Sequence, residues 1–146
     1  MRVVVCVGSN CGCRRKNVED AVAWLGTQLE DIAASEVYAS PDEYHVASAA
    51  VEADGGGASE PSIYMNCVVA GECPLEAEAL QSMCKEYELR HGRDEECRRL
   101  GDVPVDIDVV AAGDSILRPR DWNSLYFRRG YSAITTGLRG SRGRCR

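Results

Sequence analysis

Residues 105–110, with the sequence Val-Asp-Ile-Asp-Val-Val, place two acidic residues inside a run of β-branched apolar residues. Alternate side chains of a strand point to the same face, so Asp106 and Asp108 are predicted to share one face, with Cα atoms about 6.6 Å apart. Two carboxylates on one face of a buried strand repel each other and are costly to desolvate. This cost is avoided in one of two ways. Either the strand is half-exposed and both carboxylates face water, or a divalent cation is bound between them. Mg²⁺ fits the second case, because it usually takes one or two carboxylates and leaves its other positions to water and phosphates.

The periodicity of apolar residues predicts six elements in the order strand, helix, strand, strand, helix, strand. Strands are expected over residues 2–7, 32–40, 62–70 and 103–112, and helices over residues 17–29 and 74–91. This order is the βαββαβ arrangement of a ferredoxin-like sandwich. The sequence therefore predicts an α+β fold with one antiparallel sheet, both helices on one face, and the other face free for a ligand.

The composition is that of an ordinary globular protein. Of the 146 residues, 45% are hydrophobic and 27% are charged, which predicts a single domain over residues 1–136. No apolar run approaches the length of a membrane span, and residues 3–7 are too short for a signal peptide. We therefore expect a cytoplasmic protein without a membrane partner. Residues 42–61, which include three consecutive glycines, are predicted to form a mobile loop.

Charge is divided unevenly along the chain. Residues 1–117 hold 9 of the 17 basic and 22 of the 23 acidic residues, a balance of −13, whereas residues 118–146 hold 8 basic residues and 1 acidic residue, a balance of +7. Residues 137–146 have almost nothing to bury and are predicted to be a flexible basic tail. A basic tail can bind nucleic acid, but the acidic body argues against that function.

The eight cysteines do not indicate a disulfide framework, because nothing in the sequence signals export. No Cys-x-x-Cys is present, and the two histidines make a structural zinc site a poor interpretation. Cys6, Cys67 and Cys84 lie in apolar patterns and are expected to pack in the core.

Five short motifs, in this order and with these spacings, resemble one enzyme family. They are Gly8-Ser9-Asn10, Val37-Tyr38 to Pro41, Tyr64-Met65-Asn66, Glu88-Leu89-Arg90-His91-Gly92-Arg93 and Asp106-Ile107-Asp108. From about Val3 to about Gly113, the chain resembles 6-hydroxymethyl-7,8-dihydropterin pyrophosphokinase. That folate-pathway transferase moves a pyrophosphoryl group from ATP to a pterin alcohol. The family's fold is the one that the periodicity predicts.

The resemblance implies a role for each matched position. Asp106 and Asp108 would hold two Mg²⁺ ions that bridge the ATP phosphates and the pterin hydroxyl. Glu88 and Arg93 would lie at the ATP site, with Arg93 also catalytic. The pterin would be contacted by Pro41, Tyr64 and Asn66. The implied partners are the small molecules ATP and a pterin alcohol, without nucleic acid, and the oligomeric state stays open.

The chain departs from the family pattern at three places. Val103 stands where the family usually has an arginine before the paired aspartates, and residues 94–97 are mostly acidic where a basic residue is usual. The Pro-His that commonly follows the last matched strand is replaced by Arg118-Pro119-Arg120. Loss of an arginine that stabilises a transferring phosphate can cost orders of magnitude in rate. The alternative to an active enzyme is therefore a non-catalytic homologue that binds nucleotide or pterin as a regulatory or interaction module.

Overall fold

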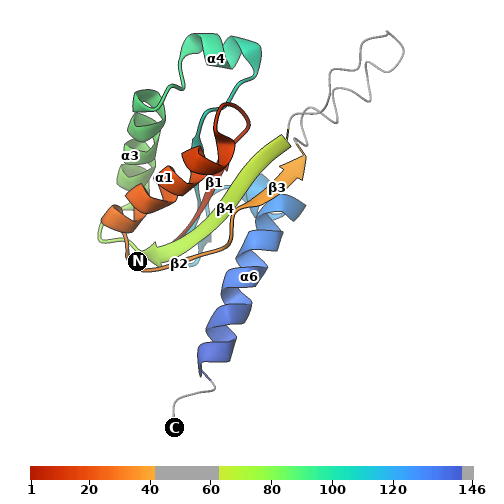
Figure 1. Cartoon of the computed structure of the whole chain (residues 1–146). Coiled ribbons are helices and arrows are strands. Elements are labelled where there is room, and N and C mark those ends of the chain that lie inside the picture. Colours follow the sequence, from red (N-terminus) through yellow and green to blue (C-terminus); the bar gives the residue numbers. More distant parts are fainter. Residues whose placement is uncertain (42–62, 143–146) are drawn as a thin grey trace.

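A six-stranded antiparallel sheet forms the centre of the protein (Figure 1). The computed structural model describes residues 1–41 and 63–142, and describes side chains as far as residue 136. The strands are β1 (Arg2–Ser9), β2 (Glu30–Ala34), β3 (Tyr38–Pro41), β4 (Ile63–Glu72), β5 (Asp106–Ala112) and β6 (Ser115–Ile116). The helices are α1 (Arg14–Gln28), α3 (Ala77–Arg90), α4 (Glu95–Leu100), α5 (Pro119–Trp122) and α6 (Leu125–Arg142).

The sheet has the strand order β2-β4-β1-β5-β6, and β3 also pairs with β4. β1 lies between β4 and β5 and pairs antiparallel with both. All of its residues except Arg2 are buried, which explains why the strand is almost entirely apolar rather than alternating. The predicted α+β fold with an antiparallel ferredoxin-like sheet is confirmed.

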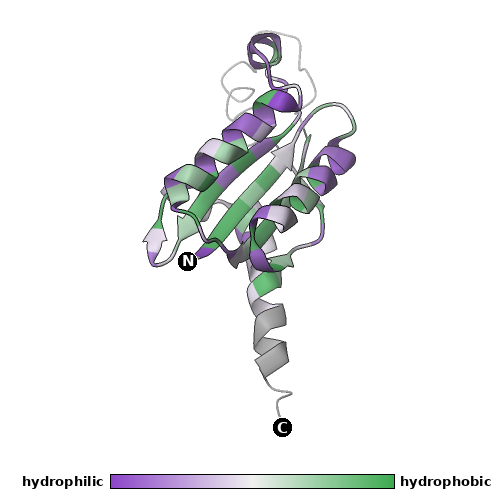
Figure 2. Cartoon of the chain, turned by 90° about the vertical axis from the view of Figure 1, so that its left-hand side faces the viewer, coloured by the Kyte–Doolittle hydropathy of each residue, from purple (hydrophilic) through white to green (hydrophobic). Residues whose placement is uncertain are grey.

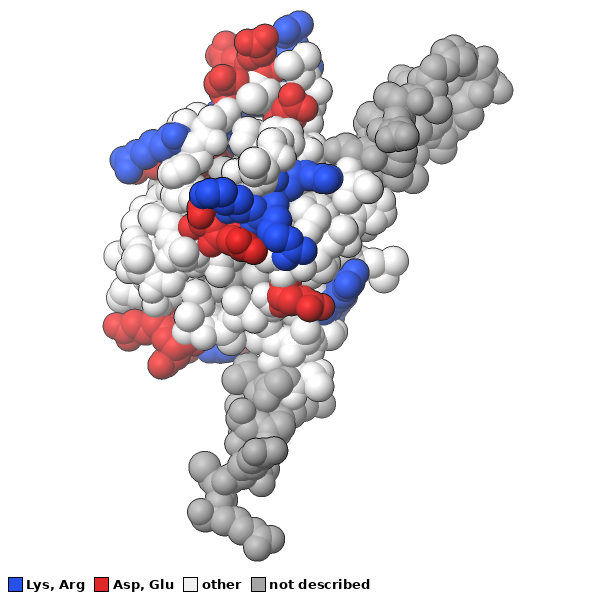
Figure 3. Space-filling view, viewed as in Figure 1, with Lys and Arg blue, Asp and Glu red and all other residues white. Residues whose placement is uncertain are grey.

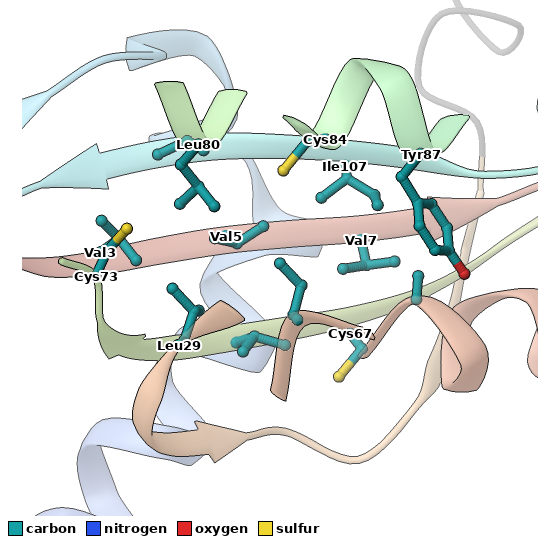
Figure 4. Close-up of a cluster of buried hydrophobic side chains, with 14 of the residues drawn as sticks. Val3, Val5, Val7, Leu29, Cys67, Cys73, Leu80, Cys84, Tyr87 and Ile107 are labelled. Atoms are coloured by element: carbon teal, nitrogen blue, oxygen red, sulfur yellow. The ribbon is translucent and has the colours of Figure 1, made fainter. Parts of the chain in front are cut away.

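One face of the sheet carries α1 and α3, as predicted. Val3, Val5 and Val7 of β1 point toward these helices and pack against Leu25 of α1 and Leu80 of α3. Figure 4 shows these valines in a row beneath the helices, and Figure 2 shows the apolar strands between the more polar outer surfaces of α1 and α3. Cys6, Cys67 and Cys84 are buried as predicted, and the cysteines that the structure describes are free thiols.

The opposite face is not left entirely free, and here the prediction of helices on one face only is incomplete. Phe127 and Ile134 of α6 pack on the sheet with Val68 and Val110, and Trp122 and Tyr131 lie against the same cluster. The helix approaches closely at Gly130, where an added Cβ would meet Tyr38 Oη and Val68 Cγ2 at 2.6 Å. Only glycine permits this approach without a shift. α6 therefore covers one end of this face.

The borders of several elements differ from the predicted ones. The single strand expected over residues 32–40 is split into β2 and β3, which pair with different parts of β4. The acidic segment at 94–97 begins a short helix, α4, rather than a loop. Asp94 caps this helix by accepting a hydrogen bond from the Cys97 amide at 2.8 Å, and acidic residues in a first turn complement the helix dipole.

Charged side chains on the face shown in Figure 3 lie in small mixed groups. On α1, Lys16 pairs with Asp20 at 2.7 Å and Arg15 pairs with Glu19 at 4.0 Å. Exposed pairs of this kind contribute little to stability. Among the described residues, no helix combines the length and hydrophobicity needed to cross a bilayer.

Two predictions concern residues outside the described part of the chain. The predicted mobile loop at 42–61 is one, and the end of the predicted basic tail, residues 143–146, is the other. The first part of that tail belongs to α6, which continues to Arg142.

Candidate active site

Three strands bring an acidic, a small and an amide residue into one row across the sheet. Gly8 of β1 pairs with Asp106 of β5 on one side and with Asn66 of β4 on the other. Neighbouring strands lie about 4.8 Å apart, so Asp106 and Asn66 are separated by roughly 10 Å across a residue without a side chain. Gly8 therefore forms the floor of a hollow between the two polar groups.

A cavity of about 170 Å³ opens over this row, on the sheet face opposite α1 and α3. It lies beyond the end of the face that α6 covers. Its lining residues come from four strands and from the segment around α5 and α6: Cys6, Gly8, Ser40, Pro41, Tyr64, Asn66, Asp106, Asp108, Arg118, Asp121 and Tyr126. The predicted free face thus carries a hollow large enough for part of a small ligand.

Asp106 and Asp108 lie on the same face, as the period of two predicts, and protonated Asp108 donates a hydrogen bond to the Asp106 carboxylate. Burial and the neighbouring Asp106 raise the pKa of Asp108 to about 7. Burial acts to raise the pKa of Asp106 as well, but the bond to Asp108 and the charges of Lys85 and Arg93 outweigh it and bring that pKa below its usual value. Two carboxylates this close together do not both ionise readily, and cations beside them favour their charged forms.

Side chains of α3 hold the outer edge of β5. The Glu88 carboxylate is buried and accepts a hydrogen bond from the Ile107 amide at 2.7 Å. Gln81 donates to the Ile107 carbonyl at 3.2 Å and accepts from the Val109 amide at 2.9 Å. These bonds satisfy backbone groups that β6 does not reach, and they fix the strand that carries both aspartates.

Two cations reach the acidic groups from the α3 side. Arg93 Nη1 lies 2.6 Å from Asp106 Oδ1 and 3.1 Å from Glu88 Oε2. Lys85 Nζ lies 3.0 Å from Glu88 Oε1 and 3.2 Å from Asp108 Oδ1. Arg93 Nε is buried and has no hydrogen-bond partner among the described residues. A buried donor of this kind is costly and indicates that the guanidinium has capacity for a further acceptor.

Arg118 approaches from the other side of the pair. It precedes α5, and its Nη1 lies 3.4 Å from Asp108 Oδ1 while its Nε donates to Asp121 Oδ2 at 2.7 Å. Among the described residues lining the cavity, Arg118 is the basic one.

Val103, at the position where the family usually has an arginine, anchors the chain before β5. Its amide donates to Asn10 Oδ1 at 2.6 Å, and its carbonyl accepts from the Asn10 amide at 2.9 Å.

The structure brings all the residues singled out from the sequence to one region. Pro41, Tyr64 and Asn66 line the cavity together with the aspartate pair, and Asn66 Nδ2 donates to Ser40 Oγ at 2.5 Å. Glu88 and Arg93 lie just outside the lining. Arg93 pairs with the lining residue Asp106, and Glu88 pairs with Lys85, which in turn pairs with the lining residue Asp108.

Sequence reasoning missed Lys85, Gln81, Asp121 and Tyr126 as site residues, and it left Arg118 as one of several arginines that could substitute for the missing one without placing it. Gln81, Lys85 and Glu88 follow one another at spacings of four and three, which places them on one helix face. That spacing was a usable sequence signal that Gln81 and Lys85 lie on the same side of the helix as Glu88. Tyr126 and Asp121 are joined by a hydrogen bond from the tyrosine hydroxyl to the carboxylate, and no local pattern indicated that this pair lies against the sheet.

The donor set fits Mg²⁺. The described residues contain no group of three or more His, Cys, Asp or Glu side chains that could together ligate a metal ion, so a bound ion would take its protein ligands from the two carboxylates. Mg²⁺ commonly binds in this way, with water and phosphate oxygens completing its shell. A buried carboxylate pair in which burial and mutual repulsion raise the pKa of Asp108 is the kind of donor set that a divalent cation stabilises.

A ferredoxin-like sheet with paired carboxylates beside basic residues and an open cavity defines a candidate enzyme of the phosphoryl-transfer type. The chain matches the family model of 7,8-dihydro-6-hydroxymethylpterin-pyrophosphokinase over residues 4–129. It therefore belongs to that family, whose members are ATP-dependent pterin diphosphokinases. No curated protein matches the chain significantly.

Proposed function

We propose that this protein transfers the pyrophosphoryl group of ATP to the hydroxymethyl group of 6-hydroxymethyl-7,8-dihydropterin, a step of folate biosynthesis. The single observation that carries the proposal is the cavity itself. Its walls combine a carboxylate pair suited to Mg²⁺ with an amide and aromatic side chains suited to a flat heterocycle.

In this proposal, one half of the cavity holds the pterin. Asn66 offers hydrogen bonds to the ring edge, Tyr64 and Tyr126 offer aromatic surfaces, and Pro41 borders the same space. The glycine floor between Asn66 and Asp106 leaves the hydroxymethyl group room to approach the aspartate pair. Holding the two reactants at fixed geometry supplies a large part of the rate enhancement in reactions of this kind.

The other half holds the ATP phosphates. The reaction joins the alcohol oxygen to the β-phosphorus and breaks the bond from that phosphorus to the α–β bridging oxygen, releasing AMP and one proton. Two Mg²⁺ ions on Asp106 and Asp108 would supply charge neutralisation and activate the alcohol. Arg93 and Arg118 flank the pair from opposite sides and orient phosphate oxygens there.

Arg118 supports catalysis despite the valine at position 103. The family's usual arginine precedes β5, whereas Arg118 follows β6, but its guanidinium returns to the aspartate pair, 3.4 Å from Asp108 Oδ1. The side chain of Arg118 is 46% exposed, so its guanidinium can leave Asp108 for a phosphate oxygen without a large loss of packing. We therefore propose that this residue restores positive charge that the sequence pattern lacks.

The test is a turnover assay with purified protein, ATP, Mg²⁺ and 6-hydroxymethyl-7,8-dihydropterin, with AMP as the measured product. The proposal expects AMP to form only when the pterin alcohol and Mg²⁺ are both present. Its formation should stop when EDTA is added and return with excess Mg²⁺. Absence of AMP under all conditions would reject the proposed activity.

The Gly8→Val variant tests the pterin half separately. A Cβ at Gly8 would lie 3.3 Å from Asn66 Oδ1 and 3.4 Å from Tyr64 Cδ1, and the two methyl groups of valine would extend from there into the hollow. We expect the KM for the pterin alcohol to rise at least about tenfold, while the KM for ATP changes little. Steady-state kinetics with each substrate varied in turn measures both, and equal changes in the two KM values would contradict this assignment.

The second candidate function is a non-catalytic member that binds nucleotide or pterin. The observation that favours it is the absence of a basic side chain at Val103 and along the acidic N-terminus of α4. This candidate expects Mg²⁺-dependent binding of a non-hydrolysable ATP analogue without AMP formation in the turnover assay. Calorimetric titration with the analogue, beside the assay above, separates the two functions.

A further inference from the structure

Lys85 lies at the centre of the acidic part of the site. Its Nζ is 3.0 Å from Glu88 Oε1, 3.2 Å from Asp108 Oδ1 and 3.7 Å from Asp106 Oδ1. Among the described basic side chains, Lys85 alone contacts all three of these carboxylates. A compact ammonium bridging two carboxylates on one strand face does what a metal ion would do there, because it neutralises their mutual repulsion.

The neighbouring charged groups are held differently. Arg93 is 22% exposed and contacts Glu88 and Asp106, and Arg118 contacts Asp108 and Asp121. Glu88 is 4% exposed and is fixed by the Ile107 amide. The Lys85 side chain, by contrast, is 44% exposed and is joined to its partners only through the ammonium. Arg118 is exposed to the same degree, at 46%, but its Nε is also held by Asp121 at 2.7 Å, whereas Lys85 has no such second anchor along its stem among the described residues. Lys85 is therefore the cation that can turn away with the fewest side-chain bonds broken outside the acidic cluster.

We propose that Lys85 is a positioning residue that holds the aspartate pair in the nucleotide-free protein and yields it to divalent cations that arrive with the nucleotide. This inference rests on the proposed function to the extent that the aspartate pair is the metal site. On release, the ammonium faces the phosphates that accompany the cation and pairs with them instead. Lys85 then remains ion-paired, but its partners are phosphate groups in place of the aspartates.

The consequence is that cation and nucleotide enter together. A divalent cation alone must displace an ammonium from two carboxylates and gains no phosphate ligands in exchange. A cation that carries a triphosphate gives the displaced ammonium a new anionic partner. Affinity for the free cation is thereby lowered, while affinity for the cation–nucleotide complex is maintained.

The experiment measures Mn²⁺, as a paramagnetic probe, binding to nucleotide-free protein by electron paramagnetic resonance at pH 8. Wild type is compared with Lys85→Gln and with Lys85→Met, which keeps much of the apolar stem. We expect both variants to bind Mn²⁺ at least about tenfold more tightly than wild type. They should also bind a non-hydrolysable ATP analogue with Mg²⁺ about tenfold more weakly, because a phosphate partner is lost.

Two matched variants control for nonspecific effects. Lys85→Arg keeps the charge and should bind Mn²⁺ as wild type does. Lys16→Gln removes an exposed lysine of α1 that pairs with Asp20 at 2.7 Å, away from the cavity, and should change neither affinity. Thermal unfolding followed by circular dichroism verifies that each variant is folded.

Unchanged or weaker Mn²⁺ binding in both charge-removing variants would overturn the inference, as would equal tightening in Lys85→Arg. The titration requires neither ATP nor turnover, so its outcome is separate from that of the AMP assay. If wild type forms no AMP while Lys85→Gln and Lys85→Met bind Mn²⁺ more tightly, the proposed activity fails and the role of Lys85 stands. If AMP forms and Mn²⁺ affinity is unchanged in these variants, the proposed activity stands and the inferred role of Lys85 fails.

Discussion

Replacing Asp106 by Asn is expected to lower kcat/KM for pyrophosphoryl transfer on the order of a thousandfold. The substitution keeps the side-chain shape but removes one of the two carboxylates available to Mg²⁺, and it replaces the charged partner that Arg93 contacts at 2.6 Å with a neutral amide. Lost stabilisation of developing charge in a buried site costs about 10² to 10³ per group, and the loss of a metal-ligating charge adds to that. Initial rates of AMP formation with saturating Mg²⁺ measure the effect.

Asp114→Asn is the matched control for this variant. Asp114 lies just beyond β5 in an exposed turn, so it tests the loss of one negative charge near the same strand without touching the cavity. Its activity should stay within about twofold of wild type. An Asp106→Asn protein that remains folded by circular dichroism and retains more than a tenth of wild-type activity would contradict the assigned role of the pair.

Arg118→Gln is expected to reduce kcat/KM for ATP about a hundredfold. An arginine that stabilises the transferring phosphate can contribute 10³-fold or more, and here Arg93 would still supply part of the charge. The loss should fall on ATP turnover and leave pterin binding largely unchanged, because Arg118 lies at the aspartate pair rather than at Asn66. Steady-state kinetics in ATP, together with calorimetric binding of the pterin alcohol, separates these two quantities.

The control for Arg118 is Arg15→Gln. Arg15 is an exposed arginine of α1 whose ion pair with Glu19 spans 4.0 Å, so its removal changes the net charge equally without altering the site. Arg118→Lys provides a second comparison, because lysine keeps the charge but not the planar fork, and it should recover only part of the activity. If Arg118→Gln turns over ATP as wild type does, the charge that Val103 lacks is supplied from elsewhere.

The parts of the fold that follow from local periodicity were predictable. The apolar stripes of α1 and α3 and the alternation in β4 gave element type and order correctly, with borders a few residues from those observed. The split between β2 and β3 was not predictable, because it depends on how two short segments register along β4. The packing of α6 had a local signal in Phe127, Gly130, Tyr131 and Ile134, which recur at helical spacing. No helix was predicted over these residues.

The candidate site likewise has some features that follow from local periodicity and others that do not. The shared direction of Asp106 and Asp108 follows from the period of a strand, and Tyr64 and Asn66 share a face for the same reason. Lys85 and Arg118 reach the pair from elements about 20 residues before it and 10 after it. Their contacts depend on how α3 lies along the edge of β5 and on where the chain turns after β6. The helical spacing places Lys85 on one face with Gln81 and Glu88, but the strand that this face meets, like the position of Arg118, is set by tertiary packing.

The bonds from Gln81 and Glu88 to the edge of β5 have a second consequence, for self-association. An open strand edge is a template on which another chain can add a strand, and such edges are frequent starting points for aggregation. Near Ile107 and Val109, side-chain amide and carboxylate groups of α3 already occupy the edge amides and one carbonyl. The helix that steadies the acidic strand thus also shields an apolar stretch of backbone from intermolecular pairing.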